Sequence, residues 1–134
     1  MTRTTERESF LADIITTAVE GGIGYWADIK EYRWYCPSLN GGTAEPAPNG
    51  GGNAHVTLYD EDSERDYTVT PDVIATALGK IRGAAPIPFM TEQTRQLVRT
   101  CDRLNDTVPG GGDIDAAVAD QILQVSIFGH VIYG

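Results

Sequence analysis

The sequence has few of the residues that carry common chemistry, and it is poor in positive charge. It contains two cysteines and two histidines in 134 residues, and ten Lys and Arg stand against nineteen Asp and Glu, for a formal net charge of −9. Because an acidic surface repels phosphate, this balance argues against direct binding to nucleic acid and to anionic membranes. With so few Cys and His, we expect neither a metal site nor a cofactor.

Long hydrophobic runs are also lacking. No apolar stretch approaches the ~20 residues needed to span a bilayer, and residues 1–9 lack the charged-then-apolar pattern of a signal peptide. These features predict a cytoplasmic protein, in which Cys36 and Cys101 are buried free thiols rather than a disulfide. The length predicts a single domain over residues 1–134 with a core of its own.

Helical periodicity is present in four segments. The first follows a capping box at residues 5–8, in which Glu8 would bond the Thr5 amide, and it ends at Gly21–Gly22 through a left-handed cap. Three further helices are expected. Their predicted start residues are Thr70, Thr91 and either Asp113 or Asp115, and their predicted ends are Gly83, the glycine run at 110–112 and Gly129.

Alternating apolar residues predict a small sheet. Residues 25–36 read as a strand with a bulge near Lys30–Glu31, residues 55–59 and 67–69 as a hairpin, and residues 131–133 as a possible short terminal strand. The fold class expected is α+β, with an antiparallel sheet of about three strands against about four helices. Residues 37–53, rich in Gly and Pro, predict a flexible loop.

Two groups of side chains are candidates for binding or chemistry. Arg95, Arg99 and Arg103 recur every four residues and would form a stripe opposite the apolar face of their helix. Such a stripe suits either phosphate and carboxylate recognition or simple solvation. Asp120 and Gln124 share a helix face, with Asp115 nearby. They are a weak basis for acid–base catalysis, and capping and surface solvation explain them better.

A pattern in two halves resembles a known group of proteins. It comprises Glu20-Gly21-Gly22-Ile23, Tyr25-Trp26, Leu58-Tyr59-Asp60 and Tyr67 with Thr70, and then Ile114-Asp115, Ala119-Asp120, Gln124, Phe128-Gly129 and Tyr133-Gly134. In this respect the chain resembles a family of small uncharacterised proteins from phages, prophages and actinobacterial mobile elements. The resemblance implies an accessory gene of a mobile element, acting in the cytoplasm of the host cell, and implies no particular activity.

The two halves of the pattern could meet in space. If the first and last helices pack together, a shared patch would contain Glu20, Tyr25, Trp26, Asp120 and Gln124. Aromatic rings beside glycine backbone can stack on a planar ligand, although Tyr and Trp in a small domain are often part of the core.

Several functions are compatible with these features. The first is a non-enzymatic protein that binds and antagonises a host component, such as a defence protein, by presenting its acidic surface as a DNA mimic would. The second is sequestration of a small nucleotide-like signal by Tyr25, Trp26 and the three arginines. The third is a small enzyme that uses Asp or Glu for acid–base chemistry. The apolar segment 127–133 leaves open whether the chain forms a homo-oligomer through it or buries it in the core.

Overall fold

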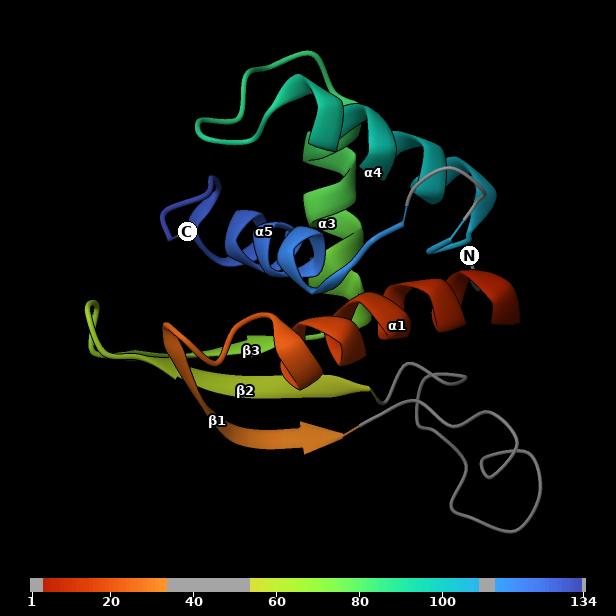
Figure 1. Ribbon diagram of the computed structural model, residues 1–134. Coiled ribbons are helices and arrows are strands. Elements are labelled where there is room, and N and C mark those ends of the chain that lie inside the picture. Colours follow the sequence, from red (N-terminus) through yellow and green to blue (C-terminus); the bar gives the residue numbers. More distant parts are fainter. Residues whose placement is uncertain (1–3, 34–53, 109–112, 134) are drawn as a thin grey trace, which may run out of the picture.

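Four helices and three strands make up the described part of the chain, which comprises residues 4–33, 54–108 and 113–133 of a computed structural model (Figure 1). In chain order they are α1 (Thr5–Gly21), β1 (Ala27–Arg33), β2 (His55–Asp60), β3 (Arg65–Val69), α3 (Pro71–Arg82), α4 (Glu92–Leu104) and α5 (Ala116–Phe128). The arrangement is α+β, as the sequence predicts. The loop predicted at 37–53 lies outside the described residues.

The strands form one antiparallel sheet in the order β1-β2-β3. The pairing of β1 with β2 shifts register between Ile29 and Glu31, which confirms the predicted bulge. Along β2, Val56, Leu58 and Asp60 are buried and alternate with half-buried residues. The alternation directs these three side chains to one face of the sheet.

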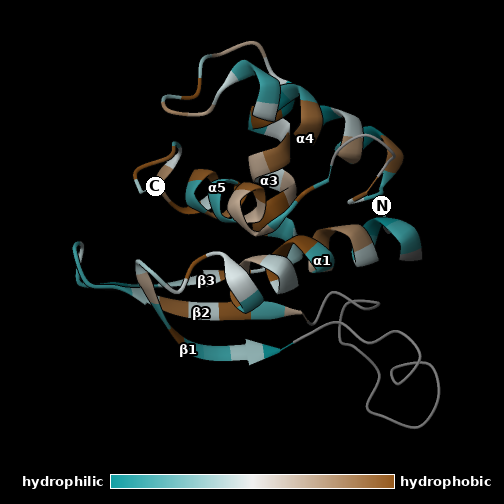
Figure 2. Cartoon of the chain, in the orientation of Figure 1, coloured by the Kyte–Doolittle hydropathy of each residue, from teal (hydrophilic) through white to brown (hydrophobic). Residues whose placement is uncertain are grey.

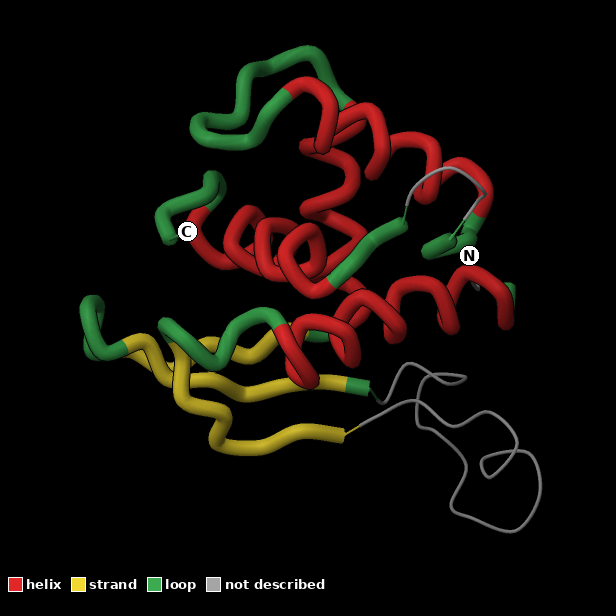
Figure 3. Tube along the Cα trace, viewed as in Figure 1, coloured by secondary structure: helices red, strands yellow, loops and turns green. Residues whose placement is uncertain are grey.

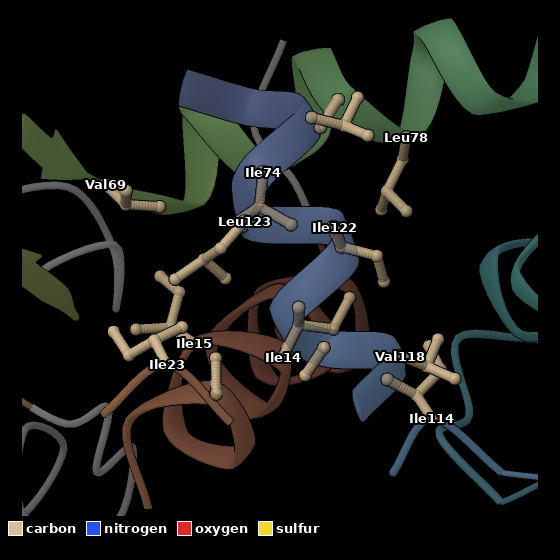
Figure 4. Close-up of a cluster of buried hydrophobic side chains, with 14 of the residues drawn as sticks. Ile14, Ile15, Ile23, Val69, Ile74, Leu78, Ile114, Val118, Ile122 and Leu123 are labelled. Carbon is tan, nitrogen blue, oxygen red and sulfur yellow. The ribbon is translucent and has the colours of Figure 1, made fainter. Parts of the chain in front are cut away.

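The helices cover that face of the sheet. Figures 1 and 3 show α1 and α5 on the same side of the sheet, with α4 farthest from it. Helix α1 contacts β2, α5 contacts β3, and α4 packs against α3. The apolar faces of three helices meet the sheet in one core, shown in Figure 4, which includes Ile14, Ile15, Val69, Ile74, Leu78, Ile122 and Leu123.

The helix boundaries follow the predicted caps except at two ends. One is the end of α4, which the sequence predicts at the glycine run but which lies at Leu104, because Asn105 adopts the left-handed cap conformation with a φ of 52°. Thr70, Thr91 and Asp115 are N-caps, and Gly129 ends α5 with a φ of 83°. The predicted capping box is wrong by one residue, because Thr4 is the N-cap of α1 and its Oγ1 accepts a hydrogen bond from the Arg7 amide at 3.1 Å.

The end of α1 needs glycine for a reason other than the predicted one. Gly22 has a φ of −107°, so the left-handed cap predicted there is wrong. A Cβ atom on Gly22 would instead lie 2.6 Å from the carbonyl oxygen of Ala116. Glycine therefore permits the end of α1 to lie directly against the start of α5.

Candidate functional site

Helix α5 carries a carboxylate that the fold buries. Asp120 is 5% exposed and accepts three hydrogen bonds. Its Oδ2 accepts from the Tyr25 hydroxyl at 2.6 Å, and its Oδ1 accepts from Trp26 Nε1 at 2.7 Å and Gln124 Nε2 at 2.9 Å. Burying a carboxylate is costly unless donors replace its water. The three donors meet that requirement and tie the segment after α1 to α5.

Gln124, one turn further along α5, is completely buried and uses its whole carboxamide. Its Nε2 donates to Asp120 and to the Tyr133 carbonyl oxygen at 3.1 Å, and its Oε1 accepts from the amides of Ile132 and Tyr133 at 2.7 and 2.8 Å. A carboxamide has two donors and two acceptor positions, and all four are used here. The terminal strand predicted at 131–133 is wrong, because this side chain satisfies the backbone that a strand partner would bond.

Tyr133 links this network to the sheet. Its ring stacks on Trp26, with centroids 5.0 Å apart and planes at 12°. Its hydroxyl lies 2.8 Å from Asp60 Oδ1 and 3.1 Å from Asp62 Oδ2. Desolvation and the two carboxylates raise the pKa of Tyr133 above its ordinary value, because each disfavours the phenolate. Desolvation and the bond to Asp120 likewise raise the pKa of Tyr25 to about 12.

A cleft opens between the end of α1 and the start of α5. This α1–α5 cleft has a volume of about 770 Å³, within the range typical of small-molecule sites. It is lined by residues from four parts of the chain: Gly21, Gly22, Tyr25, Phe89, Ala116, Ala117, Asp120, Gln121, Val131, Ile132 and Tyr133. The lining has one ionisable carboxylate and, among these residues, no basic side chain.

Gln121, a lining residue of this cleft, carries an unusual buried atom. Its Oε1 is buried and has no hydrogen-bond partner within the described structure. An unsatisfied buried acceptor costs about 1–3 kcal/mol, and folded proteins contain few of them.

Phe89, from the connection between α3 and α4, is the second unusual residue of the cleft. Its side chain is 84% exposed, and its φ is 66°, in the left-handed region that costs a non-glycine residue roughly 1–2 kcal/mol. Burial of the ring does not repay this strain, because the ring is open to solvent. Strained residues of this kind are concentrated at ligand sites.

A smaller acidic pocket shares Tyr25 and Tyr133 with the cleft. Its volume is about 410 Å³, and both tyrosines line it together with Gly24, Trp26, Ala27, Asp28, Glu61 and Asp62. Three of these residues are carboxylates and none is basic. The pocket sits beside the β2–β3 turn, which Figure 2 shows as hydrophilic.

The structure brings most of the predicted patch together. Tyr25, Trp26, Asp120 and Gln124 form one hydrogen-bonded cluster, while Glu20 is exposed in the last turn of α1, beside Gly21 of the cleft. Trp26 belongs to the core, and it is the Tyr25 ring, 60% exposed, that faces solvent.

Asp115 is placed differently from Asp120. Its Oδ1 accepts from the Val118 amide at 2.9 Å as the N-cap of α5. Both carboxylates predicted on this helix therefore have structural hydrogen bonds.

The arginine stripe does not form the exposed surface that its spacing predicts. Arg95 is 6% exposed and donates to the carbonyl oxygens of Lys80, Ile81 and Gly83 at the end of α3. Arg99 donates to two of these three oxygens. The prediction is wrong because the carbonyls left unpaired at a helix end attract the guanidinium groups of the neighbouring helix.

Arg103 alone of the three keeps the exposed position that the stripe predicts. Leu104 beside it is also exposed, at 52%. None of the three arginines lines the α1–α5 cleft or the acidic pocket.

Several residues of the site were not predicted as site residues, among them Asp28, Glu61 and Asp62 of the acidic pocket. Asp60 and Tyr133 belong to the network, and Phe89 and Gln121 to the cleft. The alternation Val56, Leu58, Asp60 could have revealed that Asp60 points inward, since it continues the buried face of β2. Phe89, Gln121 and Tyr133 carry no such periodic signal.

Among the described residues, no cysteine lines the α1–α5 cleft or the acidic pocket. Cys101 is a buried free thiol, as predicted, and burial raises its pKa; Cys36 lies outside the described residues.

Within residues 4–33, 54–108 and 113–133, no group of three or more His, Cys, Asp or Glu side chains could hold a metal ion. None of the helices described there is long and apolar enough to cross a membrane.

The fold and site define an α+β protein whose first and last helices enclose a cleft beside an acidic pocket. Comparison with family models, with curated proteins and with solved structures found no match. The resemblance to phage and mobile-element proteins therefore stays a prediction.

Proposed function

We propose that this protein is a non-enzymatic binding protein that antagonises a host protein by occupying a basic surface on it, as a DNA mimic does. The observation that carries the proposal is the acidic pocket, in which Asp28, Glu61 and Asp62 line one depression beside two tyrosines. A host component is the expected partner because the sequence resembles proteins of phages and mobile elements.

The pocket has the chemistry to receive a guanidinium or ammonium group. Carboxylates form charge-assisted hydrogen bonds with such groups, and the faces of tyrosine rings attract cations. Tyr25 and Tyr133 line the pocket along with the acids. An Arg or Lys side chain from a partner would therefore meet both kinds of group in one place.

The distribution of charge in the fold favours the same surface. Several basic side chains bond within the chain: Arg7 and Arg82 pair with Asp102, and Arg95 and Arg99 cap α3. Glu61, Asp62, Glu64 and Asp66 are exposed around the β2–β3 turn, where Arg65 is the basic neighbour. The field at this end of the molecule is consequently negative and would steer a basic partner toward the pocket.

The test is capture of basic proteins from a host lysate by the immobilised chain, followed by affinity measurements with each purified captured protein. The pocket variant carries Asp28→Asn, Glu61→Gln and Asp62→Asn. The control variant carries Glu6→Gln, Asp13→Asn and Asp113→Asn, which changes the net charge equally at exposed positions outside the pocket.

We expect the wild type and the control variant to bind the same basic protein, and the pocket variant to lose it. Binding should weaken as salt rises from about 0.1 M to about 1 M, since the Debye length falls from about 10 Å to about 3 Å. Equal binding by the two variants, or affinity that salt leaves unchanged, would contradict the proposal.

A further inference from the structure

We infer that the free edge of β1 pairs with β1 of a second copy of this chain, in antiparallel orientation. Within residues 4–33, 54–108 and 113–133 the sheet order is β1-β2-β3, so β1 has a strand partner on one side only. Figure 1 shows β1 at one edge of the sheet, and residues 28–31 and Arg33 are exposed there. This pairing does not rest on the function proposed for the acidic pocket.

The first argument is the order of charges along β1. Residues 28–33 read Asp-Ile-Lys-Glu-Tyr-Arg, so their signs are negative, neutral, positive, negative, neutral and positive. Read backwards, the same series has every sign inverted. An antiparallel copy centred between the fourth and fifth residues of β1 therefore meets opposite charge at each charged position, which stabilises a strand pair. The facing pairs, each formed twice by symmetry, are Asp28 with Arg33, Ile29 with Tyr32, and Lys30 with Glu31.

The bulge in β1 makes this pairing possible. Facing residues of two paired strands point to the same face of the sheet, whereas residues five apart in a regular strand point to opposite faces. Asp28 and Arg33 are five apart, yet both lie opposite outward-facing residues of β2, because the register shifts between Ile29 and Glu31. The irregularity thus gives the two ends of β1 the same outward direction.

The other facing pairs also match in direction. Glu31 lies opposite an outward residue of β2, and Lys30 Nζ is 5.3 Å from the centre of the outward Tyr59 ring. Ile29 and Tyr32 instead lie opposite buried residues of β2, on the face that the helices cover. Ile29 is nevertheless 40% exposed, so a second copy would cover an apolar side chain that the helices leave open to solvent.

The charges and the bulge also select the partner. Both features normally prevent an edge strand from pairing with other chains. On β1 they disfavour a strand that sets a like charge or an apolar residue opposite Lys30 or Glu31. A strand with the inverted series of charges escapes this penalty, and a second copy carries that series in its own β1.

The pairing would change the surroundings of the acidic pocket. Asp28 lines that pocket and would face Arg33 of the second copy. Each copy would therefore place a guanidinium group beside the other's pocket, which lowers the negative charge available there to a third protein.

The test is sedimentation equilibrium of the intact chain at about 0.1 M salt. We expect a dimer of twice the chain mass of 14.5 kDa, with a dissociation constant below about 100 µM. Lys30→Glu and Glu31→Lys, made separately, should each weaken the dimer by about tenfold or more. The reason is that each substitution puts like charges into both of the Lys30–Glu31 pairs.

The two single variants should complement each other. Mixed in equal amounts, they should form a heterodimer about as tightly as the wild type dimerises, because a chain with two acids at the centre of β1 then faces a chain with two bases. This result also shows that both variants are folded. The double variant, with Lys30→Glu and Glu31→Lys together, should dimerise like the wild type.

Matched controls lie on β3, the other edge strand of the described sheet. Arg65→Glu and Asp66→Lys reverse charges at exposed positions and change the net charge by the same amounts as the two β1 variants. Both should leave the dimer unaffected, which separates facing charges from a general effect of net charge.

Three results would overturn the inference. They are a wild-type chain that stays monomeric up to about 1 mM, a dimer that either β1 reversal leaves intact, and single variants that do not associate when mixed. Neither Lys30 nor Glu31 lines the acidic pocket, so these results are independent of the capture experiment.

Discussion

Replacing Gln124 with Leu tests the role of the buried carboxamide. Leu is similar in volume and apolar, so the substitution removes four hydrogen bonds without opening a large cavity. The bond to the Asp120 carboxylate is worth about 2 kcal/mol. The remaining three bonds hold the segment 131–133, which can leave the surface and bond to water instead.

Release of segment 131–133 accounts for the remaining loss of folding stability. It would forfeit the stacking of Tyr133 on Trp26 and the burial of Val131, together worth about 1–3 kcal/mol. We therefore expect Gln124→Leu to lower the free energy of unfolding by about 3–5 kcal/mol in total. Urea denaturation followed by circular dichroism measures this change.

A double-mutant cycle distinguishes this mechanism from a simple packing defect. In a chain that lacks residues 131–134, Gln124→Leu should cost only the Asp120 bond, about 2 kcal/mol. A cost below about 1 kcal/mol in the full chain, or the same cost in both chains, would refute the idea that Gln124 holds the C-terminal segment.

Three other substitutions test the packing and the electrostatics. Gly22→Ala should destabilise the fold by about 1–3 kcal/mol in thermal melts, because the new Cβ would lie 2.6 Å from a backbone oxygen of α5. The control Gly24→Ala should be neutral, since nothing lies within 4 Å of its Cβ, and equal effects of the two substitutions would contradict the close approach. Arg95→Ala should lower the free energy of unfolding by about 2–4 kcal/mol, because the carbonyl oxygens at the end of α3 lose their donor. Arg103→Ala, at an exposed position, should lower it by less than about 0.5 kcal/mol, and similar losses for the two variants would contradict the capping role of Arg95. Folding raises the pKa of Tyr25 from 10.0 to about 12. The protonated Tyr25 hydroxyl therefore contributes its full share of the folding stability below pH 10, and this share is lost as the pH rises to about 12. Tyr25→Phe should remove that part of the alkaline loss in denaturation curves, and an unchanged pH profile would contradict it.

Much of the fold could be predicted from local signals in the sequence. Thr70, Thr91 and Asp115 cap helices because their side chains accept from backbone amides three residues on. The bulge at Lys30 follows from a slip in alternation that the backbone pairing repeats. Such features depend on neighbours in sequence, and they need no knowledge of the tertiary structure.

The errors arise where a distant group decides the outcome. Arg95 lies on what looks like a polar face, yet it is buried because the end of α3 offers carbonyl oxygens to it. Residues 131–133 have strand-forming composition, but Gln124 supplies their hydrogen bonds. In both cases a side chain from another element replaces the backbone partner that local reasoning assumes.

The candidate site was likewise predictable in part from local sequence and in part not. The meeting of Tyr25 and Trp26 with Asp120 and Gln124 could be anticipated from motifs at the ends of two helices. The cleft itself could not, because it also needs Phe89 from the connection between α3 and α4. Nothing in the local sequence indicates that this connection reaches the same cleft as the start of α5.

The close packing of α1 on α5 has a consequence for folding during synthesis. The two helices begin at residues 5 and 116, so the part of α1 that packs on α5 must wait for nearly the whole chain to be made, whereas β2 and α3, which α1 also contacts, are made earlier. At ~5–20 residues per second this interval is on the order of ten seconds. Throughout that time Leu11, Ile14 and Ile15 have no α5 to cover them. A chain that is still being made therefore leaves the α5-facing part of α1 uncovered, whereas refolding begins with both helices present.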